Sequence, residues 1–476
     1  MKARVPAAAV AKKLLIEVEH GLRNIMLMPP QLLDAPAYWE AIARVLPQAE
    51  AMVRGNDCVG RKQWEVTPRA MLKDLPQNTR VTLLLNLFSS TLASILFFYA
   101  ALYMQGVGLT APQIGLIASL ASVTGFLTQA MAAPVVNRMG RKRSLLLFSF
   151  LCWSVPLLLW MLANGFTLFL LAALFFSISR ITAIAWYCVV TEGVPERQKA
   201  KVFGIMFIFG SVGGLATLLA GPVIDRFGLV PAMRALYGLA FVMMTGMFIF
   251  RHGLLTESEA GLEQQRRHGS LSLVASVLHH IETVRQNLAN REFRALTAVF
   301  VLFAFASGMD FVTILFMNKE LHFSVPQLSL IPPLTAVISI LLYRVTLTHV
   351  HAANERSILC LSLAALAAGK VMLLVTPAGS VWWLLAVSGV GAAGGYLFQV
   401  AISAALNNRM GASHMADASS AVQLLAALFS IPAGYVAGAL YAHRPGLAIL
   451  VTGVLTFAAV LPLLRKAAIP VPDPAG

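Results

Sequence analysis

Long apolar runs alternate with short polar stretches along most of the chain. Each run has about 20 residues, the length of helix that crosses the roughly 30 Å hydrocarbon core of a bilayer. Gly and Pro interrupt many of the runs, which helices packed in a membrane bundle tolerate. The pattern predicts twelve membrane-spanning helices, at residues 81–104, 114–136, 144–162, 165–190, 202–224, 232–250, 294–318, 326–348, 357–376, 380–406, 417–441 and 446–464.

The composition is also typical of a membrane protein. Of the 476 residues, 58% are hydrophobic and only 12% are charged, and the mean hydropathy is +0.75. A soluble domain of this composition would expose large apolar patches to water. The predicted fold class is therefore an all-α membrane protein.

The predicted spans fall into two sets of six, separated by a polar segment. Apolar residues recur at helical spacing from Leu14 to Ile25 and again from Leu271 to Leu288, so each stretch predicts a helix that lies along the membrane surface. The predicted parts are an N-terminal helical segment (1–78), a first six-helix bundle (79–250), a linker with an amphipathic helix (251–293), a second six-helix bundle (294–466) and a short tail (467–476).

Lys and Arg collect in the connections on one side of the predicted spans, for example in residues 138–143 and 197–201. Cytoplasmic connections of membrane proteins carry such an excess. The sequence therefore predicts a multi-pass protein of the cell (inner or plasma) membrane whose N- and C-termini are both cytoplasmic. The same bias explains much of the net charge of +15, so no nucleic-acid partner is expected.

The usual motifs of enzymes and metal sites are missing from the sequence. It contains no nucleophile elbow, no phosphate-binding Gly-rich loop and no HExxH. The four cysteines lack metal-site or disulfide spacing, and the His pairs at 279–280 and 349–351 have no acidic or Cys companion. We therefore expect a protein that is not an enzyme and that has no cofactor and no metal.

One short sequence occurs twice in the chain. AAPVVNRMG (132–140) closes the second predicted span, and AGPVIDRFG (220–228) closes the fifth. The copies are three spans apart and therefore lie on opposite sides of the membrane. A fainter copy with one inserted residue, AGALYAHRPG (437–446), closes the eleventh span. Inverted repeats of this kind are typical of secondary transporters, whose substrate sites lie near the bilayer midplane between repeats.

The first copy continues into a motif of a known family. The stretch APVVNRMGRKRSL (133–145) is similar to the loop motif G-x-x-x-D-R-x-G-R-R/K of the major facilitator superfamily, and it stands in the same place, between the second and third spans. The resemblance covers residues 81–464. It implies two six-helix bundles around a central cavity that opens alternately to each side. It also implies that spans one, four, seven and ten line this cavity.

Several positions depart from the motif. Asn137 stands where the family has Asp and Ala133 where it has Gly, so the charge partnership that helps to close the cytoplasmic side is expected to be weaker. Gly221-Pro222 resembles the antiporter pattern G-P-x-x-G-G without its later glycines, so the direction of transport does not follow from the resemblance. The predicted gating motif comprises Asn137, Arg138, Gly140, Arg141, Lys142, Asp225 and Arg226.

Polar residues concentrate on the four spans that the resemblance names. Ser177, Arg180 and Tyr187 fall at helical spacing on one face of the fourth span, whereas the third span is nearly all apolar. The predicted substrate and proton pathway comprises Arg180, Asp310, Tyr187, Gln399, Tyr396, Asn86 and Trp186.

Two charged residues lie deep within predicted spans. At helical rise, Arg180 is about 21 Å from the outer end of its span and Asp310 about 24 Å from the inner end of its span. A charge at such depth costs roughly 2.5–3.5 kcal/mol, so each is expected to face protein or water. Two interpretations stay open: a structural ion pair between the halves, or handling of substrate or protons. Lys370, on a peripheral span, is interpreted as a side chain that extends to the outer interface.

These features together predict a secondary active transporter, either a permease or an exporter. Its solute would be a small organic molecule, amphipathic or anionic, moved by alternating access. The predicted cavity aromatics suit an amphipathic solute, and Arg180 suits one with an anionic group. One buried acid is a simple proton carrier, so proton coupling is favoured over sodium coupling. The alternative is a transport-inactive membrane scaffold or assembly factor with the same fold.

Overall fold

The computed structural model describes residues 75–268, 291–349, 354–409 and 415–464, together with positions 72, 282 and 285. The surface helix predicted between Leu14 and Ile25 lies outside these residues. The helix predicted between Leu271 and Leu288 also lies outside them, except for two positions.

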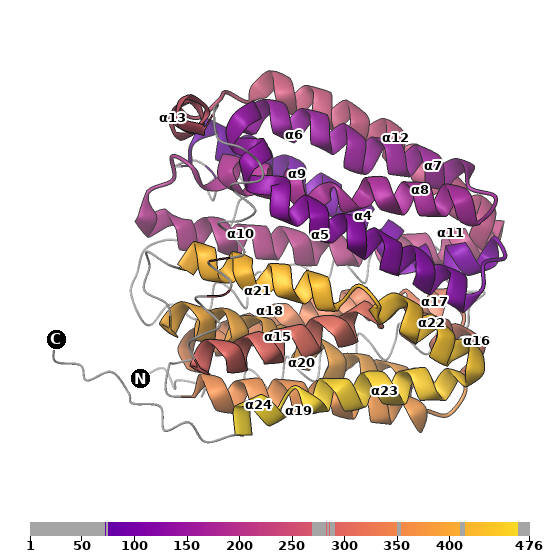
Figure 1. Ribbon diagram of the computed structural model, residues 1–476. Helices are drawn as coiled ribbons and strands as arrows, with labels where there is room; N and C mark the ends of the chain where they lie inside the picture. The colour runs from indigo at the N-terminus through magenta and orange to yellow at the C-terminus, as the bar shows by residue number, and fades with distance from the viewer. Residues whose placement is uncertain are drawn as a thin grey trace, which may run out of the picture. The chain divides into compact units, whose positions relative to one another are not determined.

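Twelve helical segments of the described residues are long and apolar enough to cross a membrane, and each corresponds to one predicted span. In Figure 1 the first six (indigo to magenta) lie beside the last six (orange to yellow). The first six are α4 (Gln77–Gly106), α5 (Ala111–Met139), α6 with π-helical η2 and α7 (Arg141–Ser149, Phe150–Ser154, Val155–Leu162), α8 with α9 (Phe166–Ser177, Ser179–Thr191), α10 with α11 (Glu196–Leu215, Thr217–Phe227) and α12 (Leu229–Leu254). The last six are α15 with α16 (Arg291–Gly308, Phe311–Lys319), α17 with α18 (Val325–Leu328, Ile331–His349), α19 (Glu355–Leu374), α20 (Val381–Arg409), α21 with α22 (Met415–Phe429, Ala433–His443) and α23 with α24 (Pro445–Ala458, Leu461–Leu464).

Buried aromatic side chains hold the first bundle together. The Tyr103 ring lies 5.3 Å from that of Phe169 and 5.4 Å from that of Tyr237, and its hydroxyl donates a hydrogen bond to the Trp160 carbonyl at 2.8 Å. Edge-to-face and tilted aromatic pairs at such distances are stabilising, and a buried tyrosine hydroxyl needs a partner. These contacts join the first, third, fourth and sixth spans into one unit.

The two full copies of the repeated phrase adopt the same local structure. α5 and α11 each contain a proline, Pro134 and Pro222, and each ends at a glycine with positive φ: Gly140 at φ 85°, ψ 159° and Gly228 at φ 81°, ψ 152°. Glycine is favoured there because a Cβ atom would be strained. The third copy differs, because Arg444 joins α22 to α23 at φ −149°. Three spans separate the two glycine turns, so we call the opposite sides of the molecule the Gly140 face and the Gly228 face.

Several of the described spans are each divided into two helices. Proline lies in or beside two of the divisions: Pro432 directly before α22, and Pro332 as the second residue of α18. Its missing N–H group interrupts the helical hydrogen bonds there. The divisions fall at Ile178, at Ala216, at Met309–Asp310, at Ser329–Leu330, at Ser430–Pro432 and at Ala459–Val460.

The two bundles touch most closely toward the Gly228 face. A Cβ atom on Gly438 of α22 would lie 2.4 Å from the Ala111 carbonyl oxygen of α5, and one on Gly115 would lie 2.2 Å from the Gly434 carbonyl oxygen. Such spacing brings two backbones together as small-xxx-small pairs do in membranes. A second contact joins α11 to the α17–α18 connection, where the Thr217 hydroxyl donates to the Ser329 carbonyl at 3.2 Å.

Candidate functional site

An exposed stripe on α9 begins with the deep arginine. Arg180 follows the helix division at Ile178, and the exposed positions of α9 are Arg180, Ala183 and Tyr187, which share one face by helical spacing. Tyr187 is 51% exposed and stacks on Phe203 of α10 with ring centroids 6.0 Å apart. Among the described residues Arg180 has no hydrogen bond and no ion pair. A charge in this position is costly toward lipid, so we expect the stripe to face water or a ligand.

Gln399 supplies an exposed polar group on the opposite bundle. Its neighbours on α20 fix its direction: the Tyr396 hydroxyl lies 3.0 Å from the Thr346 hydroxyl of α18, and the Phe398 ring stacks on Phe303 of α15. Helix geometry places residue 399 between these two directions. Gln399 therefore points between α15 and α18, and it is exposed.

The other predicted pathway residues pack within their bundles. Trp186 is partly buried and packs against the cluster that contains Ala185 and Val189. Tyr396 is only 9% exposed. Asn86 is partly buried on α4, one turn before Ser90, whose hydroxyl donates to the Phe209 carbonyl. Of the three aromatic residues in the predicted pathway, Tyr187 is therefore the one whose side chain is exposed.

Asp310 forms an ion pair with Lys370. The Lys370 Nζ atom lies 2.5 Å from the Asp310 Oδ1 atom and 2.9 Å from the Thr313 hydroxyl. The Lys370 side chain is 16% exposed and the Asp310 side chain 50%. The interpretation of Lys370 as a side chain extending to the interface is therefore wrong, because α19 lies close enough for its ammonium group to reach α16. The structure does not form the alternative pair between Asp310 and Arg180, which has no ion pair among the described residues.

The gating motif of the first bundle is a closed network of polar contacts. Arg141 is buried, and its Nε atom lies 3.1 Å from a Glu192 carboxylate oxygen. Its guanidinium also donates to the Asn137 side-chain oxygen at 3.0 Å, and the Ser258 hydroxyl donates to the other Glu192 oxygen. Arg141 thus has a carboxylate partner at the end of α9, although position 137 is neutral.

A second carboxylate caps α6, and sequence reasoning missed it. Glu257, just before α13 (Glu259–His268), accepts hydrogen bonds from the backbone N–H groups of Arg141 at 2.8 Å and Lys142 at 3.0 Å. A negative charge at a helix N-terminus satisfies free N–H groups and the helix dipole. A Cβ atom at Gly140 would lie 2.8 Å from this carboxylate, which is a second reason for glycine in the motif.

The remaining motif residues are exposed. Arg138 lies on the Gly140 face beside the network. Asp225 and Arg226 close α11 on the Gly228 face, where Arg226 lies 5.8 Å from the Phe227 ring centroid. The second copy therefore repeats the turn of the first copy and exposes its charged residues.

Replacing Glu257 with glutamine is expected to lower the stability of the first bundle. The loss should be about 1 kcal/mol, the typical worth of a helix cap with its charge–dipole interaction. Thermal unfolding of the purified protein measures it as a lower melting temperature. Asp225→Asn is the matched control, because Asp225 is exposed near the C-terminal end of α11, caps no helix N-terminus and has no partner among the described residues. Equal melting temperatures for the two variants would contradict the capping role.

Comparison with known proteins identifies the family. Residues 82–434 match the model of the Major Facilitator Superfamily, and the protein belongs to this family. It is therefore a multi-pass membrane transporter with a small-molecule substrate rather than an enzyme.

Solved structures share the fold at low sequence identity. The nucleoside transporter NupG is 14% identical with a TM-score of 0.63, over 82% of this chain and 100% of that one. The human organic anion transporter MFSD10 (TETRAN) is 16% identical with a TM-score of 0.59, over 82% of this chain and 100% of that one. A POT family transporter in complex with 5-aminolevulinic acid is 14% identical with a TM-score of 0.60, over 85% of this chain and 97% of that one. No curated protein sequence matches.

Proposed function

We propose that the protein is a secondary active transporter that moves a small amphipathic organic anion across the cell membrane by alternating access. The observation that carries this proposal is Arg180, an exposed arginine in the middle of a span with no partner among the described residues. An anionic group of the solute would supply the missing charge and acceptors. Tyr187 and Phe203, stacked on the same side, would contact its apolar part.

The proposed orientation places the Gly140 face in the cytoplasm. Exposed basic residues lie at this face, including Arg138 and Arg143, and a Lys and Arg excess marks cytoplasmic connections. The closest contacts between the bundles lie toward the Gly228 face, whereas Tyr187 and Gln399 lie in the halves of their spans nearer the Gly140 face. In this conformation the solute would therefore enter from the cytoplasm.

The proposed coupling ion is the proton, bound at Asp310. The half-exposed Asp310 carboxylate holds the Lys370 ammonium group inside the second bundle. Protonation of the acid would release this lysine, so proton binding and the side-chain link between α16 and α19 would be coupled. The pair lies at a helix division, where the backbone has fewer helical hydrogen bonds to break.

A thermal-shift screen of small organic anions and their neutral analogues tests the proposed substrate class. An anion that stabilises the wild-type protein should bind roughly 10- to 100-fold more weakly to Arg180→Gln, because charged hydrogen bonds contribute about 1.5–3 kcal/mol. The matched control is Arg226→Gln, an exposed arginine at the Gly228 face, which should bind like the wild type. Equal binding of the anion by wild type and Arg180→Gln would overturn the role of Arg180.

A further inference from the structure

Gln129 is a polar residue of the second span and lies outside the predicted pathway. Its side chain, on α5, is partly exposed. Among the described residues it has no hydrogen bond. An amide without a partner is costly inside a membrane, so the direction in which this side chain points is informative.

The packing of α5 determines the direction of Gln129. Ala132 shares a buried cluster with α9, and Phe126 packs against a cluster formed by α15 and α21 of the second bundle. At about 100° per residue, Gln129 lies between these two directions. Leu127 and Met131 are exposed on the opposite side of α5, where apolar side chains suit lipid. Gln129 therefore points into the space between α9 and the second bundle.

Arg180 points into the same space from α9. On this helix Ile181 belongs to the cluster shared with α5, and the Val190 carbonyl accepts a hydrogen bond from Thr79 of α4 at 3.0 Å. Helical spacing places Arg180 between the side that faces α5 and the side that faces α4. The exposed side of α9 and the Gln129 side of α5 are therefore neighbours.

One hydrogen bond shows that Arg180 and Gln129 lie at a similar depth. The Thr128 hydroxyl donates to the Ser177 carbonyl at 3.0 Å. Both spans run from the Gly228 face to the Gly140 face. Gln129 is one residue beyond Thr128, and Arg180 is three residues beyond Ser177, so their depths agree within about one helical turn of 5.4 Å.

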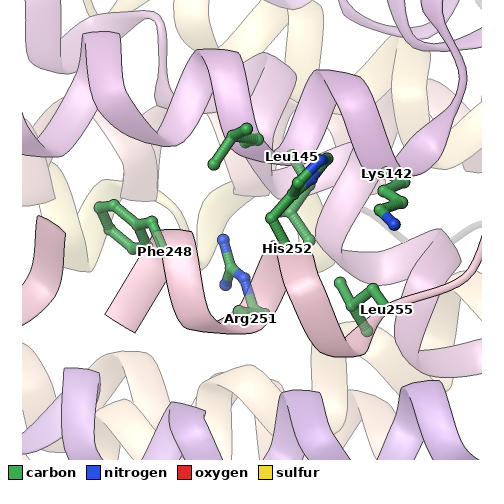
Figure 2. A pocket seen from close by; sticks show the side chains of 7 residues that line it. Lys142, Leu145, Phe248, Arg251, His252 and Leu255 are labelled. Atoms are coloured by element: carbon green, nitrogen blue, oxygen red, sulfur yellow. The ribbon is translucent and has the colours of Figure 1, made fainter. Parts of the chain in front are cut away.

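Arg251, a buried arginine of α12, has partners within its own bundle, unlike Arg180 and Gln129. Its guanidinium lies 5.2 Å from the Phe248 ring centroid (Figure 2), and one terminal nitrogen donates to the Ser149 hydroxyl at 2.9 Å. Arg180 and Gln129 have neither a hydrogen bond nor an ion pair among the described residues. A guanidinium and an amide in this situation can bind a solute without breaking contacts within the protein.

We propose that Arg180 and Gln129 together bind one oxyanion group of the solute from two neighbouring spans. This inference rests on the proposed function and adds to it a second binding residue and the class of anion. The planar guanidinium donates to two oxygens, and the amide nitrogen donates to one more acceptor site. Donors on two spans favour a group with at least two oxygens, such as a carboxylate, over a primary amide, which has one oxygen and no charge.

Calorimetric titration of the purified full-length protein with benzoate, phenylacetate and cinnamate, and with their primary amides, tests this pair. Gln129→Met keeps the side-chain length and removes the amide, so affinity for the carboxylates should fall roughly 10- to 100-fold, the worth of one hydrogen bond to a charged group. Gln129→Glu should bind them still more weakly, because its carboxylate repels the anion and pairs with Arg180. Gln105→Glu is the matched control, because Gln105 is partly exposed in the last turn of α4, at the Gly228 face, and its side chain has no partner among the described residues.

The outcomes separate this inference from the proposed function. A carboxylate that binds the wild type and Gln129→Met equally, but loses affinity in Arg180→Gln, would overturn the role of Gln129 and leave the proposed function standing. Equal losses in Gln129→Glu and Gln105→Glu would mean that added charge acts without a specific contact, which would also overturn it. If none of the carboxylates binds the wild type, both proposals are wrong for this class of anion. Loss of carboxylate affinity in both Gln129 variants, with Gln105→Glu and the binding of the amides unchanged, would support the pair.

Discussion

Replacing Asp310 with asparagine is expected to abolish accumulation of solute driven by a pH gradient. Asparagine keeps the size of the side chain and can still accept a hydrogen bond from Lys370, which lies 2.5 Å from Asp310, but it cannot titrate. If Asp310 carries the proton, the variant should still bind and exchange solute while losing uphill transport. Proteoliposome uptake with and without a pH gradient, using an anion that stabilises the wild type in the thermal-shift screen, measures both properties.

The ion pair with Lys370 gives a second, distinguishable outcome. If the pair is only structural, Asp310→Asn should leave an unpaired, largely buried cation and lose stability, and Lys370→Gln should restore it in the double variant. Asp225→Asn is the matched control, since this acid is exposed at the Gly228 face. A stable Asp310→Asn protein with full gradient-driven uptake would exclude both roles.

Valine at position 438 is expected to separate the bundles at the Gly228 face. Its Cβ atom would lie 2.4 Å from the Ala111 carbonyl oxygen and 2.9 Å from the Pro112 Cα atom, and neither backbone atom can move without shifting α5. Overpacking of this kind costs about 1–3 kcal/mol, so the population should shift roughly 5- to 150-fold toward the form open at this face.

Spin labels at Thr167 and Ala378, both exposed at the Gly228 face, measure this shift as longer distances in double electron–electron resonance. Gly446→Val is the matched control, because a Cβ atom there meets only the Leu374 side chain at 3.5 Å. Unchanged distances in Gly438→Val would mean that the contact between α5 and α22 does not hold this face closed.

The spans could be predicted from the sequence because the length of an apolar run determines whether a helix can cross a bilayer. The run predicted at 114–136 corresponds to α5, which ends at the glycine turn of the motif. Runs of apolar residues do not reveal where a helix divides, since Ile178 and Ala216, where two of the spans divide, are ordinary helix residues. The family could be predicted from a short loop motif because that motif stands at a fixed place between two spans. The match over residues 82–434 confirms the prediction.

The contacts of the site could be predicted only in part. Arg180 and Asp310 stand out because charges are rare within spans, but spacing along one helix does not show which other helix lies beside it. Lys370 was therefore assigned to the interface, although it pairs with Asp310. Glu257 is 116 residues from Arg141 in the chain, and no local pattern links a linker carboxylate to a distant helix end. Such contacts follow from the tertiary fold.

The divided spans change how the Gly228 face can open. α11 (Thr217–Phe227) and α22 (Ala433–His443) have 11 residues each, so each is about 16 Å long at helical rise. A bend of about 20° at the division swings the far end of such a segment through about 5 Å. Gly434 lies next to the division and moves little, whereas Gly438, further along α22, would move away from Ala111. The short helices α11 and α22 can therefore separate the two bundles at the Gly228 face while the longer helices of the same spans keep their packing.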